Sequence, residues 1–275
     1  MKQKAKLLFH TIKYLKFSQV FNRIKRRFVK PAIDMSPAPD VSVVARKLQS
    51  VVRRQPRMLN ENRFEFLNVI ADIQIAADWN SPDQDKLWLY NLHYFDDLNA
   101  IKASQRFFWH TNLIECWINE NPPCSGNGWE AYPSSLRIVN WIKWILAGNS
   151  FKQKWLDSLA IQVRYLSNNL ETHLLGNHLF VNAKALVFAG LFFEGKDADR
   201  WYQNGLNIIE KEVLEQVLAD GGNFELSPMY HSLFLEDLLD LVNIHRAYNK
   251  DVISGVKDKI LPMFDWLNSM CHPDG

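Results

Sequence analysis

The chain has 275 residues and a formal net charge of +2 at pH 7, and 47% of its residues are hydrophobic. This composition supports a large buried core, in one big domain or a domain with an extension, and argues against intrinsic disorder. The three cysteines, Cys116, Cys124 and Cys271, form no CxxC pair and are odd in number, which indicates neither a disulfide framework nor a zinc site. We therefore expect no metal, no cofactor and a reducing compartment.

Charge is distributed unevenly along the chain. Residues 1–57 contain 15 Lys and Arg against Asp34 and Asp40, whereas residues 58–275 contain 17 Lys and Arg against 28 Asp and Glu. The sequence thus divides into a basic N-terminal arm with a linker and an acidic body. No recognised DNA- or RNA-binding motif accompanies the basic residues, so we expect no nucleic-acid partner.

The arm has an amphipathic pattern. Apolar residues recur at spacings of three and four from Leu8 to Phe28, which predicts one or two helices broken near Ser18, followed by a Pro-rich linker at 31–42. Such an arm could pack on the acidic body or contact a membrane surface. No secretory signal or membrane-spanning stretch is visible, so we expect a cytoplasmic location, with membrane association as an alternative and a periplasmic location less favoured.

The body is mostly helical in pattern. Residues 58–90 fit either short strands or a helical stretch, and the segments beyond them are separated by short Gly, Pro or Asn breaks. Short connections favour antiparallel hairpins, so we predict an all-α fold in which a ring of hairpins buries the inner helices. The predicted helices are 91–103, 106–120, 134–147, 151–169, 178–193, 199–218, 230–248 and 252–270.

Two of these helices begin with polar clusters. Ser227 is a good N-cap and Pro228 suits the first helical position, which puts Tyr230 and His231 in the first turn. Gly176 similarly breaks the chain before Asn177 and His178. Helix N-termini carry free N–H groups and the positive end of the dipole, so the two first turns predict an anion site. An amide, a phenol and imidazoles beside it fit acid–base chemistry on a carboxylated substrate.

Five segments, in order, resemble the N-terminal region of heparinase II/III-like polysaccharide lyases. They are LYNLHYFDDL, WINENPP, GWEAYPSSLRIVNWIKW, GNHLFVNAKALVFAGLFF and DGGNFELSPMYHSLFLEDLLDL, and the resemblance covers roughly residues 80–250. It implies an incomplete (α/α) toroid with a cleft for an acidic polysaccharide, normally followed by a β-sandwich domain. The chain stops at 271–275, where that domain would begin. We therefore expect the β-sandwich to be absent or on another chain, and the chain alone to be inactive or nearly so.

The resemblance also implies site roles. A lyase cleaves a uronate-containing glycan by β-elimination: it removes the C5 proton, stabilises the charge on the carboxylate and protonates the leaving O4. Asn177 is expected to stabilise the carboxylate, His178 or a deprotonated Tyr230 to remove the proton, and Tyr230 to protonate O4. His231 is a candidate helper.

Further residues are candidates for substrate binding. Arg137 could contact substrate carboxylates or pair with Glu130, because an Arg fork suits both. Tyr94 and Trp129 are candidate cleft residues, although most tryptophans in such a chain pack between helices. Glu225 is expected to orient Ser227 and Tyr230.

Three functions remain open at this point. The first is a polysaccharide lyase, or part of one, and the second is a non-catalytic protein of glycan binding or envelope-polysaccharide assembly. The third is a glycoside hydrolase with Asp220 and Glu225 as its carboxylate pair, although Asp220–Gly221–Gly222 has the pattern of a turn.

Overall fold

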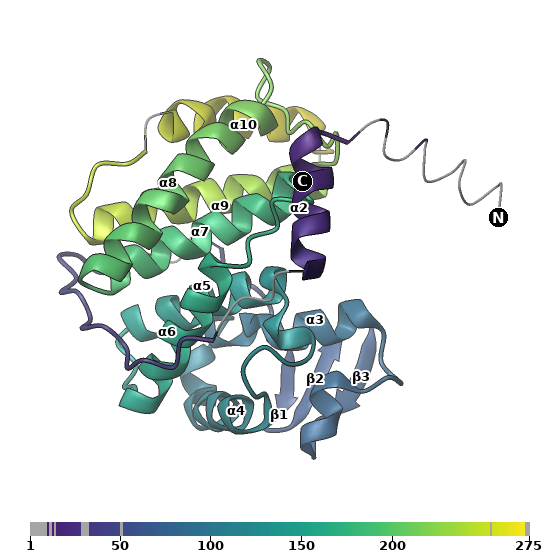
Figure 1. Ribbon diagram of the computed structural model, residues 1–275, viewed down its shortest axis with the longest axis vertical. Coiled ribbons are helices and arrows are strands. Elements are labelled where there is room, and N and C mark those ends of the chain that lie inside the picture. The colour runs from purple at the N-terminus through teal and green to yellow at the C-terminus, as the bar shows by residue number, and fades with distance from the viewer. Residues whose placement is uncertain are drawn as a thin grey trace.

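A computed structural model describes residues 10, 13, 15–28, 33–49, 52–253 and 255–272. Within them the chain is mainly helical, with a small sheet at one end and the helical hairpins stacked away from it (Figure 1). No helix in this part of the chain combines the length and the apolar character that crossing a membrane requires.

The helical body is an open row of antiparallel hairpins. Helices α3, α5, α7 and α9 contact one another in that order, while α6 packs on α5, α8 on α7 and α10 on α9. This arrangement confirms the predicted incomplete helical toroid. The helices are α3 Lys86–Tyr94, α4 Phe107–Glu120, α5 Ala131–Leu146, α6 Gln153–Ser167, α7 Gly176–Phe192, α8 Lys196–Gln216, α9 Pro228–Ala247 and α10 Val256–Met270.

Helix α7 lies at the centre of the row and is buried on nearly all sides. Its closest neighbour is α8, and two glycines allow the close approach. A Cβ on Gly190 would lie 2.6 Å from the backbone nitrogen of Tyr202, and one on Gly205 would lie 2.8 Å from the carbonyl oxygen of Ala183. Neither position can take a larger side chain unless a backbone moves.

Residues 58–72 form strands, one of the two alternatives that the sequence left open. Strands β1 Met58–Asn60, β2 Arg63–Phe66 and β3 Val69–Asp72 make an antiparallel sheet in the order β1-β2-β3. The inner face of β2 packs on α3, where Phe66 meets Trp88 edge to face at 5.3 Å. The small sheet thus packs over helix α3.

The predicted helix at 91–103 was wrong in its limits. Helix α3 begins earlier, because the Asp85 side chain accepts from the backbone N–H of Leu87, and it stops before Phe95, which is left-handed at φ 62°. Short 3-10 turns follow at 96–99 and 103–106. The cause is tertiary, since the buried Asp97 carboxylate binds Arg106 and His110 at 2.7 and 2.9 Å.

The described part of the arm packs on the acidic body. Helix α2, Phe17–Phe28, begins directly after the non-helical residues Leu15 and Lys16, so the chain is interrupted close to Ser18, as expected. Lys16 pairs with Glu215 at 2.6 Å, and in the linker the Arg164 guanidinium donates to the carbonyls of Ser36 and Pro37. Most of the apolar positions predicted near Leu8 lie outside the described residues.

Candidate functional site

The first turns of α7 and α9 lie side by side. The rings of Phe180, about one turn into α7, and of Phe234, nearly two turns into α9, are 4.3 Å apart. The loop before α9 also lies against the start of α7, because a Cβ on Gly176 would meet Phe224 and Glu225 at 3.7 Å. Ser227 caps α9 by accepting from the backbone N–H of Tyr230, as predicted. Two helix N-termini therefore point their free N–H groups toward one region.

Asn177 and His178 gather around Tyr132, which belongs to the first turn of α5. The Asn177 amide donates to the Tyr132 hydroxyl at 3.4 Å, and the His178 ring lies on the Tyr132 ring with centroids 4.7 Å apart. On its other side, His178 Nδ1 is 3.3 Å from Glu171 Oε1, so a protonated His178 would be ion-paired. The His178 side chain is 42% exposed and can reach a ligand.

Three phenols share this region. The Tyr94 and Tyr132 rings are 6.0 Å apart, and burial raises the pKa of Tyr132 to about 12. Burial also raises the pKa of Tyr94, and the nearby phenol of Tyr230 adds to the rise in both. Tyr94 and Tyr132 therefore keep their protons at neutral pH. Tyr230 is 39% exposed and is the most accessible of the three.

A pocket of about 210 Å³ opens beside Tyr94, Tyr132 and Asn177, and its lining does not include His178 or Tyr230. Tyr94, Tyr132 and Asn177 line one part of it, and charged side chains from α9 and from the N-terminal segment line another. The full lining is Arg54, Asn91, Tyr94, Asp96, Tyr132, Leu136, Asn177, Val181, Leu233, Glu236 and Asp237. Two of the predicted site residues, Asn177 and Tyr94, therefore lie in the same pocket wall.

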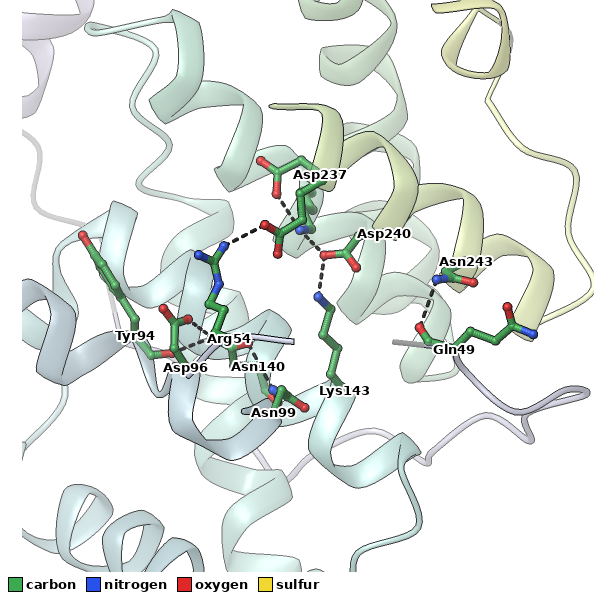
Figure 2. Close-up of polar contacts among 12 residues, drawn as sticks. Gln49, Arg54, Tyr94, Asp96, Asn99, Asn140, Lys143, Asp237, Asp240 and Asn243 are labelled. Atoms are coloured by element: carbon green, nitrogen blue, oxygen red, sulfur yellow. Dashed lines mark hydrogen bonds and ion pairs between the residues drawn. The ribbon is translucent and has the colours of Figure 1, made fainter. Parts of the chain in front are cut away.

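A network of buried ion pairs includes Asp237, which lines this pocket (Figure 2). Lys184 of α7 contacts Asp237 at 2.6 Å and Asp240 at 2.5 Å, and Lys143 of α5 also contacts Asp240. Burial alone would lower the pKa of Lys184, but the two carboxylates raise it above its ordinary value. Lys184 therefore stays charged and ties α7 to α9.

His231 does not face the pocket. Its ring is fully buried and stacks on Trp266 at 4.4 Å. Nδ1 accepts from the backbone N–H of Asn223, which requires the proton on Nε2, and Nε2 then donates to the carbonyl of Met263 at 2.9 Å. The predicted helper histidine instead holds α10 and the loop before α9 against α9.

Arg137 and Trp129 are also structural. Arg137 has no exposed surface, lies 3.8 Å above the Trp117 ring and donates to Gln162 and to the carbonyls of His93 and Gly128. It neither pairs with Glu130 nor faces a ligand, and Glu130 instead binds Lys86 and Tyr90. Trp129 is 4% exposed and donates to the carbonyl of Asn121.

The loop carboxylates are placed apart from the pocket lining. Glu225 is exposed, and its backbone N–H is bound by the Asn223 side chain. Asp220 accepts from the backbone N–H of Gly222 at 2.9 Å, which is the turn that its sequence suggested. This local role argues against Asp220 as a hydrolase acid or base.

Several pocket residues were missed by the sequence reasoning. Tyr132 stands in the segment GWEAYPSSLRIVNW, directly before Pro133 at a helix start, and that position could have identified it. Asp96, Glu236 and Asp237 also lie in segments singled out above, but nothing local separates them from surface carboxylates. Arg54 lies in the basic arm, where its charge is one of many.

Comparisons with known proteins agree with the helical fold. The heparinase II/III N-terminus family model matches residues 103–275. Heparin-sulfate lyase of Pedobacter heparinus is 33% identical over 217 residues, which is 74% of this chain and 31% of that protein. Heparin-sulfate lyase of Bacteroides thetaiotaomicron is 29% identical over 142 residues, 48% of this chain and 20% of that protein.

Solved structures show the same fold. Heparan sulfate lyase HepC from Pedobacter heparinus matches with a TM-score of 0.56 at 22% identity, over 93% of this chain and 44% of that one. A heparinase III structure matches with a TM-score of 0.56 at 23% identity, over 76% of this chain and 34% of that one. This chain thus spans less than half of each solved relative. With the family model matching more than half of its residues, the chain belongs to the heparinase II/III family of polysaccharide lyases, and it contains the N-terminal helical region.

Proposed function

We propose that this helical region binds an acidic, uronate-containing polysaccharide and takes part in its cleavage by β-elimination. The observation that most supports the proposal is the contact of Asn177 and His178 with the phenol of Tyr132, which is itself close enough to Tyr230 for that phenol to affect its pKa. The relatives named heparin-sulfate lyase favour this chemistry, and because the chain covers about a third or less of their length, the activity of the whole protein belongs to the proposal.

The elimination can be assigned to these side chains. The base takes the proton from C5, the C5–H electron pair forms the C4–C5 double bond, the C4–O4 bond breaks, and O4 receives a proton. The Asn177 amide donates to the uronate carboxylate as negative charge builds up on it, and its long 3.4 Å bond to Tyr132 is easily exchanged for that contact. His178 or a deprotonated Tyr230 removes the C5 proton, since both are accessible.

The leaving O4 needs a proton donor. Burial raises the pKa of Tyr94 and of Tyr132, so these two phenols are weaker proton donors than an exposed phenol. Tyr230 is exposed enough to meet a glycosidic oxygen, and it stands in the first turn of α9. We therefore assign proton donation to Tyr230 and the support of its position to the neighbouring phenols.

The test follows the unsaturated uronate product by its ultraviolet absorbance. Heparan sulfate, hyaluronan, alginate and bacterial exopolysaccharides are each incubated with the purified chain and with a version that carries a family β-sandwich domain. Tyr230→Phe is expected to lower the rate about 10²- to 10⁴-fold with little change in substrate affinity, and Asn177→Ala to lower the rate as well.

Tyr248→Phe is the matched control. Tyr248 follows the last residue of α9, 18 positions from Tyr230, which corresponds to about 27 Å along a helix. It should retain the full rate. Full turnover by Tyr230→Phe would remove the phenol from the mechanism. Glycan binding without any unsaturated product, in either version, would favour the non-catalytic binding protein instead.

A further inference from the structure

Two described stretches of the N-terminal segment, 33–49 and 52–57, contact α9 and the turn at Ile101. The backbone N–H groups of Ala45 and Arg46 both donate to the carbonyl of Ala247 at 2.9 Å. The Asn243 amide then donates to the carbonyl of Gln49 at 3.0 Å (Figure 2). Further on, the carbonyl of Arg54 accepts from the N–H of Ile101 at 2.9 Å. These backbone contacts fix the segment independently of the side chain at position 54.

The segment delivers Arg54 to the pocket that Asn177 lines. Among the described residues lining that pocket, Arg54 is the only Lys, Arg or His. Its guanidinium contacts Glu236 Oε2 at 2.8 Å, and 43% of the side chain is exposed, against 17% for Glu236. Figure 2 shows it reaching across toward α9, with Tyr94 and Asp96 on its other side. Arg54 also lies outside residues 103–275, the part that the family model covers.

Other charged side chains near the pocket are bound by groups of the protein. Asp237 and Asp240 are held by Lys184 and Lys143 in the buried network, so these four charges balance one another. Asp96 is bound by the Asn140 amide at 2.8 Å. Asp96 and Glu236 both attract Arg54, and its direct ion pair is with Glu236. The described lining offers an anion neutral donors at Asn91, Asn177 and the tyrosines, and its positive charge comes from the Arg54 guanidinium.

The Arg54–Glu236 contact can be exchanged. It uses one of five guanidinium N–H donors, whereas a carboxylate placed in line with the fork can take two. Burial raises the pKa of Glu236, so this carboxyl is more ready than an exposed one to take a proton when it loses Arg54. The groups that act on it are Arg54, Lys184 and Lys143, which favour its charge, and Asp240, which opposes it.

We propose that Arg54 is a specificity residue that binds a uronate carboxylate of the polysaccharide in place of Glu236. This inference rests on the proposed function, because it names the group that selects the acidic substrate of the same site. A guanidinium fork on a preformed segment discriminates a carboxylate from a neutral hydroxymethyl group, which a pocket of carboxylates and phenols alone would not do.

The experiment measures binding, so it does not depend on turnover. Oligosaccharides of heparan sulfate, hyaluronan and alginate are titrated calorimetrically into the purified chain, each beside its carboxyl-reduced form. The wild-type chain is expected to bind at least one uronate oligosaccharide in preference to its reduced form. Arg54→Gln should weaken that binding about 10- to 100-fold, the size expected for a charge-assisted hydrogen-bonded pair, and should abolish the preference.

Two further variants separate recognition from structure. Arg53→Gln, next along the chain and outside the Asn177 pocket, should bind within about 3-fold of wild type. Glu236→Gln removes the internal competitor and should bind the uronate as tightly as wild type or up to about 10-fold more tightly. If Arg54→Gln does not fold, as judged by circular dichroism, Glu236→Gln and Arg54→Lys decide the question, with Arg54→Lys expected to bind with intermediate affinity.

The outcomes distinguish the two proposals. Unchanged affinity and preference in Arg54→Gln, with a wild-type chain that binds, would overturn the role of Arg54 and leave the proposed function in place. A loss of binding in Glu236→Gln as large as in Arg54→Gln would show that the pair is structural and would also overturn it. A wild-type chain that binds none of the oligosaccharides would overturn both.

Discussion

Replacing Lys184 with Met tests the buried ion network. The Lys184 side chain is 5% exposed, and it contacts two carboxylates, Asp237 at 12% and Asp240 at 2% exposure. Met keeps the volume of the side chain but leaves both carboxylates without this partner. Removing one member of a buried pair costs about 3–5 kcal/mol, because the remaining charge is uncompensated. For a chain of this size that corresponds to a fall in melting temperature of about 6–15 °C.

The loss of unfolding free energy in Lys184→Met should depend on pH. In the wild-type chain Lys184 and Lys143 outweigh burial and lower the pKa of Asp240, so this carboxylate contributes stability above its unfolded pKa of about 4. That contribution is lost as pH falls through the lowered pKa of Asp240 in the folded chain. In Lys184→Met much of the stability contributed by the Asp240 carboxylate is already absent, and protonation of either aspartate relieves the repulsion between Asp237 and Asp240. The difference in unfolding free energy between the two proteins should therefore shrink as pH falls toward 4.

Urea denaturation followed by Trp fluorescence, at pH 7 and near pH 4.5, measures both effects. Lys86→Met is the matched control, since Lys86 is 62% exposed in its pair with Glu130 and should cost about 1 kcal/mol or less. A loss below about 1 kcal/mol for Lys184→Met at pH 7, or a loss that stays constant with pH, would refute the argument that these buried charges depend on Lys184.

Two further predictions concern packing. His231→Phe keeps the ring against Trp266 but leaves the Asn223 N–H and the Met263 carbonyl unpaired, so the unfolding free energy should fall by about 1–3 kcal/mol. Glycan binding per folded molecule should stay unchanged. Weakened binding in the folded variant would give His231 a role in the site. Gly190→Ala should cost about 1–3 kcal/mol because its Cβ would overlap the backbone of α8, and wild-type stability by urea denaturation would mean that α7 and α8 can move apart.

Local signals account for what the sequence predicted well. The start of α9 follows from Ser227 and Pro228, whose effects on the first turn are confined to neighbouring residues. Helices α4 to α10 were each predicted within a few residues because apolar periodicity and short breaks are also local. The limits of α3 failed because the Asp97 carboxylate, bound to Arg106 and His110, imposes a turn that no nearby residue specifies.

The composition of the pocket depends on contacts between distant segments. Arg54 reaches it only because the N-terminal segment is tied to α9 and to Ile101, and Tyr132 only because α5 packs beside α7. Neither of these tertiary contacts can be predicted from the residues that flank Arg54 or Tyr132 in the sequence. The motif segments predicted the helices that build the site, but the pocket is completed by Arg54, which lies 40 or more residues before Tyr94, Tyr132 and Asn177 of its lining.

Residue type within a motif does not separate a site residue from a structural one, and two asparagines of α7 show what does. Asn182 is fully buried; its oxygen accepts from the Glu171 N–H at 2.8 Å, and its nitrogen donates to Ser135 and to the Glu171 carboxylate at 3.0 and 3.2 Å. Asn177, five residues earlier, borders the pocket and makes a single long contact with Tyr132. A ligand can replace that contact at little cost, whereas it would have to break three short ones at Asn182. The same criterion assigns Arg137 and His231, whose polar atoms are bound by the protein, to the fold, and Arg54, with one exchangeable bond, to the site.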